Sequence, residues 1–229
     1  MKNKILLVFM AMTMVFAMAV SAQADIIIDL EIAPIQTGAS VSFLGNNLVG
    51  FNLVIDKITG INTPLHAGNA DALTSNNGLW NFTAPKLTAT PPDHWLFQND
   101  LGSTSLAVTG DFTNATTLGS VTDPVPFIAA SWISAEVHKI VGSANSYAVT
   151  GVFTDFKSLD LLNYFGVPND KMTATFTFGI TLPFGIVPPD QFTSLTVQSG
   201  DITQTPIPGS LLLLGSGLLG LVGLRVRRS

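Results

Sequence analysis

The sequence predicts an all-β domain, a single β-sandwich or jelly-roll-like fold, and three observations support this prediction. In the segment 171–182, apolar residues alternate with Thr or Gly at every second position, which indicates a strand with one buried face. Segment 147–156 is similarly rich in β-branched and aromatic residues, and weaker strand patterns cover 48–58, 79–83, 105–112 and 194–202. Turn signals at Asn76-Asn77-Gly78, Thr109-Gly110-Asp111 and Asn169-Asp170 separate them. Many short strands joined by such turns favour packed β-layers.

Segment 128–141 fits two patterns. As a strand, it would place Ile133, Ala135 and Val137 inward, and Trp132, Ser134, Glu136 and His138 outward. As a helix, it would place Ala129, Ile133, Val137, Ile140 and Val141 on one face. We favour the strand, and the helix remains the alternative.

Charge is scarce and unevenly distributed. Only 11% of the 229 residues are charged, less than half of the usual ~25%. All 15 acidic residues lie between Asp25 and Asp201, where the only basic residues are five lysines, so this body carries 5 − 15 = −10. An acidic body repels phosphate backbones, so we expect no nucleic-acid partner. Since the chain has no cysteine, it can form neither disulfides nor thiolate metal sites.

The N-terminus has the three parts of a secretory signal peptide. Lys2 and Lys4 precede an apolar run over 5–20, and Ala22 and Ala24 form a small-x-small cleavage site. A permanent membrane helix is the alternative, but the run falls short of the ~20 residues needed to span a bilayer. We therefore predict a signal peptide over 1–24 and an exported domain over 25–197.

The C-terminus consists of a polar stalk, an apolar run and a basic tail, in that order. A Thr-, Gln- and Pro-containing stalk is expected over 198–208, followed by an uncharged apolar run and a basic tail over 209–229. Gly209 to Leu224 would span ~24 Å as a helix, which is marginal for a ~30 Å hydrocarbon core. Arginines after such a helix hold its end on the cytoplasmic side. The pattern favours transient docking in the inner membrane over a permanent anchor.

This C-terminal segment resembles the PEP-CTERM sorting signal of Gram-negative bacteria. The residues that carry the resemblance are Pro206, Ile207 and Pro208, then Gly215, Ser216 and Gly217 in the apolar run, and finally Arg225, Arg227 and Arg228. The resemblance implies recognition by an exosortase-type membrane protease, cleavage near the motif, and association with exopolysaccharide and biofilm at the cell surface or outside the cell. Ile207 replaces the family's Glu, which leaves open which sorting enzyme acts.

The resemblance covers only about residues 205–229. The glycines there also fit a dinucleotide-binding pattern, but the chain ends nine residues later without the acidic residue that this motif needs. We expect these glycines to let a helix pack closely against another membrane protein.

The exported domain contains no recognised catalytic motif, and no cofactor is expected. His66, His94 and His138 lack zinc-motif spacing, and neither H-E-x-x-H nor G-x-S-x-G occurs. A glycosidase needs two facing carboxylates, and nothing in the sequence selects a pair. Calcium binding by loop oxygens leaves no visible pattern.

Tryptophans give the only hint of a ligand. Trp95, in the expected loop 91–95, and Trp132 are candidate sugar-stacking platforms, although β-sandwiches normally bury such rings. Three functions therefore remain: a non-catalytic surface or matrix protein, which we favour, a glycan-binding module that uses exposed Trp, and a secreted hydrolase.

Overall fold

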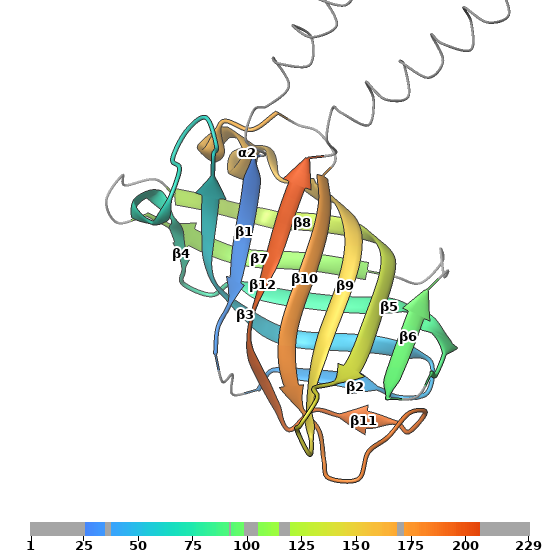
Figure 1. Ribbon diagram of the computed structural model, residues 1–229. Helices are drawn as coiled ribbons and strands as arrows, with labels where there is room; N and C mark the ends of the chain where they lie inside the picture. The colour runs from blue at the N-terminus through green and yellow to red at the C-terminus, as the bar shows by residue number, and fades with distance from the viewer. Residues whose placement is uncertain are drawn as a thin grey trace, which may run out of the picture. The chain divides into compact units, whose positions relative to one another are not determined.

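The computed structural model describes residues 26–34, 38–91, 93–98, 105–114, 120–168 and 172–206 of the chain (Figure 1). The described part is one compact unit, Ile26–Pro206. The predicted signal peptide and sorting helix lie outside these residues. Within them, no helix combines the length and apolarity needed to cross a membrane.

The all-β prediction is confirmed, because the described residues form one large antiparallel sheet with few helical turns. The helical turns are η1 (Asn69–Asp71) and α2 (Leu159–Phe165). The strands are β1 (Ile27–Ile32), β2 (Ser40–Phe43), β3 (Asn47–Ile61), β4 (Leu73–Ser75), β5 (Leu79–Ala89), β6 (His94–Gln98), β7 (Ser105–Thr113), β8 (Ser120–Lys139), β9 (Ser146–Lys157), β10 (Met172–Thr181), β11 (Phe192–Thr193) and β12 (Thr196–Pro206).

The sheet closes on itself. Its strand order is β1-β12-β10-β9-β8-β6-β5-β7-β4-β3-β2-β11, and the additional pairs β1–β3, β5–β3 and β7–β8 complete a ring. In Figure 1, β1, β12, β10, β9, the last part of β8 and β6 form a front layer, behind which β7, β5 and the first part of β3 cross at a steep angle. The space between the layers holds the core.

The two longest strands belong to both layers because each one bends. The first half of β3 pairs with β2 and β5, and its second half pairs with β1. The bend lies at Asn52, whose φ of 54° is left-handed and whose backbone N–H donates to Asn81 Oδ1 at 2.8 Å. Asn tolerates this conformation better than most residues, so the corner is encoded locally. The first part of β8 likewise pairs with β7, and its last part pairs with β6.

The core is aromatic. Trp80 lies edge-on to Phe176 and Phe178, with ring centroids 5.1 and 5.7 Å apart. Edge-to-face aromatic pairs add to the free energy gained by burying apolar area. The alternation predicted for 171–182 is confirmed along β10, where every second residue from Met172 to Ile180 is buried.

Segment 128–141 is a strand up to Lys139, as favoured, and its predicted faces are confirmed from Ser134 to His138 but wrong for Trp132 and Ile133. Trp132 is buried and Ile133 is 51% exposed. The reason is a β-bulge between Trp132 and Ser134, where the register with β9 shifts by one residue. An extra residue in one strand reverses the face of every residue on one side of it.

Three other expectations need correction. The predicted turn Thr109-Gly110-Asp111 lies within β7, where Gly110 has a φ of 128° and the register with β8 shifts. The predicted loop 91–95 runs into strand β6 from His94. The sequence patterns gave no sign of helix α2, although Ser158 caps its start and left-handed Gly166 ends it.

The prediction of a stalk over 198–208 is wrong for residues 198–206. Residues up to Pro206 belong to β12, which pairs with β1 on one side and β10 on the other. Val197, Ile202 and Gln204 of β12 are buried, with a register shift against β10 between the first two, so a segment that reads as polar and Pro-flanked still carries buried side chains. The domain therefore extends to Pro206, the first residue of the sorting motif, rather than to residue 197.

Candidate functional site

The outer face of the front layer contains a hollow of about 290 Å³. Four adjacent strands, β6, β8, β9 and β10, contribute two outward side chains each. These are Leu96, Gln98, Ser134, Glu136, Thr150, Val152, Thr175 and Thr177. We call this surface the outer hollow.

The strand register arranges the lining side chains in two parallel rows. The first row runs Gln98, Ser134, Val152, Thr175. The second row runs Leu96, Glu136, Thr150, Thr177. Since neighbouring strands lie ~4.8 Å apart, each row is ~14 Å long, and the two rows are ~6.8 Å apart.

Most polar groups of the outer hollow are free for a ligand. Within the described part of the chain, the hydroxyls of Thr150, Thr175 and Thr177 make no hydrogen bond to protein. Threonines just outside the hollow do have protein partners. Thr154 donates to Ser131 O at 3.5 Å, and Thr203 donates to Asp29 Oδ1 at 3.3 Å.

Among the described residues, Glu136 is the only ionisable side chain that lines the outer hollow. Its Oε1 lies 3.7 Å from Nε2 of His94, on the adjacent strand β6. The row that contains Glu136 continues beyond Thr177 to Asp201 on β12, which is the next acidic residue along it. Asp201 lies three strand steps from Glu136, or ~14 Å. Glycosidases hold their two carboxyl groups ~5–9.5 Å apart, so this pair does not fit that mechanism.

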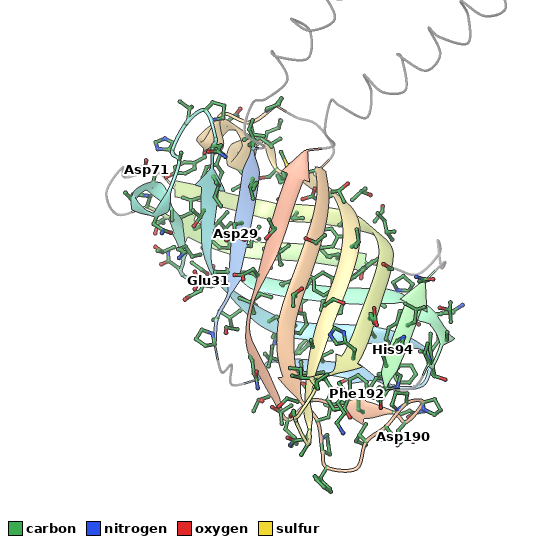
Figure 2. All side chains as sticks on the ribbon, viewed as in Figure 1. Asp29, Glu31, Asp71, His94, Asp190 and Phe192 are labelled. Carbon is green, nitrogen blue, oxygen red and sulfur yellow. The ribbon has the colours of Figure 1, made fainter. Side chains whose placement is uncertain are left out.

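A second acidic group lies on the same layer, outside the outer hollow. Asp29 and Glu31 are on β1, at the other side of the layer from His94 in Figure 2, and Asp201 lies opposite Glu31 on β12. Partial burial, and then the negative charge of Asp201, raise the pKa of Asp29. Lys57 Nζ contacts Glu31 Oε2 at 2.6 Å, and this hydrogen bond raises the pKa of the lysine.

A buried ion pair lies on the inner face of β9. Lys157 Nζ donates to Asp155 Oδ2 at 2.9 Å, and the two side chains are 1% and 0% exposed. Burial raises the pKa of Asp155 and lowers that of Lys157, while their mutual attraction opposes both shifts. Nearby on β12, Gln204 is also fully buried, and neither of its amide atoms has a hydrogen-bond partner within the described structure. These three side chains have no access to solvent, so they take no part in a surface reaction.

Both candidate sugar-stacking tryptophans are buried, which contradicts a role for their rings in glycan contact. Trp95 is 0% exposed and its Nε1 donates to Asp190 O at 3.2 Å. Trp132 is 8% exposed and its Nε1 donates to Ser105 O at 3.3 Å. Each ring packs against other core aromatics, for example Trp95 against Phe192 at 5.1 Å between ring centroids. Stacking on a sugar would require either ring to leave the core.

The remaining predicted site residues fall outside the described structure, except at one position. Ala22, Ala24 and the sorting residues from Ile207 onward are not described, and Pro206 ends β12. No cluster of three or more His, Cys, Asp or Glu side chains is placed to hold a metal ion in the residues that are described.

Sequence reasoning missed the residues of the outer hollow. Thr150, Thr175 and Thr177 read as ordinary solvent-facing positions of two strands. Only the alternation in 171–182 hinted that a row of hydroxyls shares one face. No family model, curated protein or solved structure matches this chain.

Proposed function

We propose that this chain is an exported, non-catalytic protein of the bacterial surface or extracellular matrix. In this proposal the signal peptide 1–24 directs export of one sandwich-like domain, and the segment from Pro206 to Ser229 is a membrane-engaging sorting signal. An exosortase-type protease removes that signal, after transient docking in the inner membrane. The released domain then associates with exopolysaccharide of a biofilm matrix.

One observation carries the proposal: the compact unit fills the chain between the two targeting segments. The unit begins at Ile26, two residues after Ala24, and ends at Pro206, the first residue of the sorting motif. The start of β1 pairs with the end of β12, Ile28 opposite Gln204, so both ends leave the domain at one edge. Removal of both targeting segments would thus leave the pairing of every described strand in place.

The lining of the outer hollow supports binding in preference to catalysis. Glu136 is the one carboxylate among the described residues that line the hollow, and Asp201, the next along its row, is three strand steps or ~14 Å away, beyond the ~5–9.5 Å that glycoside hydrolysis requires. Ser134 lies in the other row, and the described lining includes no histidine that could act as its base. The secreted-hydrolase alternative therefore receives no support from this surface.

The sorting part of the proposal is tested by the intact mass of the protein from extracellular and membrane fractions of its host. We expect a product that begins at Asp25 and ends near Pro208. A Pro208→Ala variant with its fold unchanged should show slower removal of the tail, whereas a Ser229→Ala variant should be processed normally. Recovery of a product that retains Arg228 in the inner membrane would overturn the sorting proposal.

A further inference from the structure

We infer that the outer hollow is a binding site for an uncharged, polyhydroxylated chain, such as a neutral polysaccharide, laid across strands β6, β8, β9 and β10. This inference deepens the proposed function, because it names the ligand class and the surface that binds it. It does not depend on whether the tail is removed.

The charge of the outer hollow argues for an uncharged ligand. None of the described residues that line it is a lysine or an arginine, so sulfated or uronic-acid polymers would find no counter-charge on them. The chain between Asp25 and Asp201 also carries a formal net charge of −10, which repels polyanions at long range. Among the described lining residues only Glu136 carries a carboxylate, so the hollow offers a polycation a single negative charge.

The hydrogen-bonding groups of the outer hollow match hydroxyl groups. Each threonine or serine hydroxyl both donates and accepts, the Gln98 amide does both, and the Glu136 carboxylate accepts strongly. A sugar hydroxyl likewise donates one hydrogen bond and accepts others. The hydroxyls of Thr150, Thr175 and Thr177 have no protein partner within the described structure, so a ligand would not have to break existing hydrogen bonds to protein.

Apolar groups lie between these polar groups. Leu96 starts one row and Val152 lies within the other, and each threonine adds a methyl group. A sugar ring presents C–H groups as well as hydroxyls, so alternation of methyl and hydroxyl groups suits both parts of its surface. The rows of ~14 Å could contact several consecutive units of a polymer. A long, open site in which polar and apolar groups alternate favours a chain over a compact small molecule, which usually occupies an enclosed apolar pocket.

The test is a binding measurement on the full chain in a polyoxyethylene-ether detergent, which carries no sugar headgroup. The probes are three neutral polymers (a glucan, a galactan and a mannan), anionic alginate and cationic chitosan. We expect retention by at least one neutral polymer, unchanged between low and high salt because no charge is neutralised.

A pair of threonine substitutions locates the binding. Thr150→Val with Thr177→Val removes two facing hydroxyls of the outer hollow and keeps the shape and β-propensity of the side chains. We expect about thirtyfold weaker binding, since two hydrogen bonds are lost and each contributes roughly 1 kcal/mol net. The matched control is Thr154→Val with Thr173→Val, which also face each other on β9 and β10 but do not line the hollow. We expect this control to bind like the parent.

Three results would each overturn the inference: no retention by any neutral polymer, salt-sensitive retention by alginate or chitosan alone, or equal weakening by both threonine pairs. Urea unfolding of every variant separates lost binding from lost fold. Because the full chain is used, a failure here leaves the sorting proposal standing. A failed mass measurement in turn leaves this binding site standing.

Discussion

Substitution of one partner of the buried ion pair should lower the free energy of unfolding far more than substitution of both partners together. In Lys157→Met, the carboxylate of Asp155 stays in the core, 0% exposed, without the ammonium that lies 2.9 Å from it in the parent. Removal of one partner of a buried pair typically costs about 3–5 kcal/mol of unfolding free energy, because an uncompensated charge remains. We expect the same order of loss for Asp155→Leu, which leaves the lysine unpaired.

The double variant Asp155→Leu with Lys157→Met should recover most of this loss. It replaces both charged groups with apolar side chains of similar size, and such replacements leave stability unchanged or increase it by about 1–4 kcal/mol. The reason is visible in the shifts of the parent, where burial is the largest influence on both groups and raises the pKa of Asp155 while lowering that of Lys157. The ion pair is therefore expected to contribute little net stability, although each charge needs the other.

The assay is urea unfolding of residues 25–208, followed by tryptophan fluorescence, because Trp80, Trp95 and Trp132 are all buried and report loss of the core. The three variants and the parent form a double-mutant cycle, from which the coupling energy follows directly. Single variants within about 1 kcal/mol of the parent, or additive losses in the double variant, would refute the reasoning. A change in the denaturant slope would show that the unfolded or native state itself had changed.

Three further predictions use the same unfolding measurement. Gln204→Met should raise stability by about 1–2 kcal/mol, because the buried amide has no hydrogen-bond partner in the described structure; a loss of stability would show that the amide is satisfied. Asp29→Asn should raise stability at pH 7 by roughly 0.5 kcal/mol after allowing for solvent screening. The folded-state pKa of Asp29 is raised above 3.8, so its penalty is absent at low pH and develops as the pH rises through that folded-state value; an advantage that persists at pH 2 would contradict this cause. Gly50→Ala should cost about 1–3 kcal/mol, because a Cβ there would overlap the ring of Phe82, and a neutral result would mean that the ring has room to move.

Where the fold could be predicted, the local pattern and the tertiary environment agree. Strand β10 was predicted almost to the residue, because its alternation persists through ten residues and one face packs on the core throughout. Strand β6 was missed because only five residues pair, too few for a periodic pattern. β12 was cut short because its inward Gln204 is polar, so the sequence does not display the buried face of its last part.

The candidate site was beyond prediction for a different reason. Its lining combines β6 with β10, segments about 80 residues apart in the sequence, and no local pattern records which strands become neighbours. The tryptophans stood out because they are rare and large, yet burial is their ordinary place. The hydroxyl of Thr154 has a protein partner, Ser131 O, whereas the hydroxyl of Thr150 has none in the described structure. This difference depends on packing and not on residue type.

The bulge in β8 connects the core to this surface. Without it, a strict alternation that buries Ala135 and Val137 would also bury Ile133 and turn Trp132 outward. An indole buries about 150–250 Å², which at ~25 cal/mol per Å² amounts to roughly 4–6 kcal/mol, more than the ~1.5–3 kcal/mol for an isoleucine side chain. Exposing Ile133 instead of Trp132 therefore loses less free energy of burial. The rings of Phe153 and Phe176 pack against the buried indole. The bulge thus lets the core bury Trp132 together with Val137, while Ser134 and Glu136 between them stay on the outer hollow.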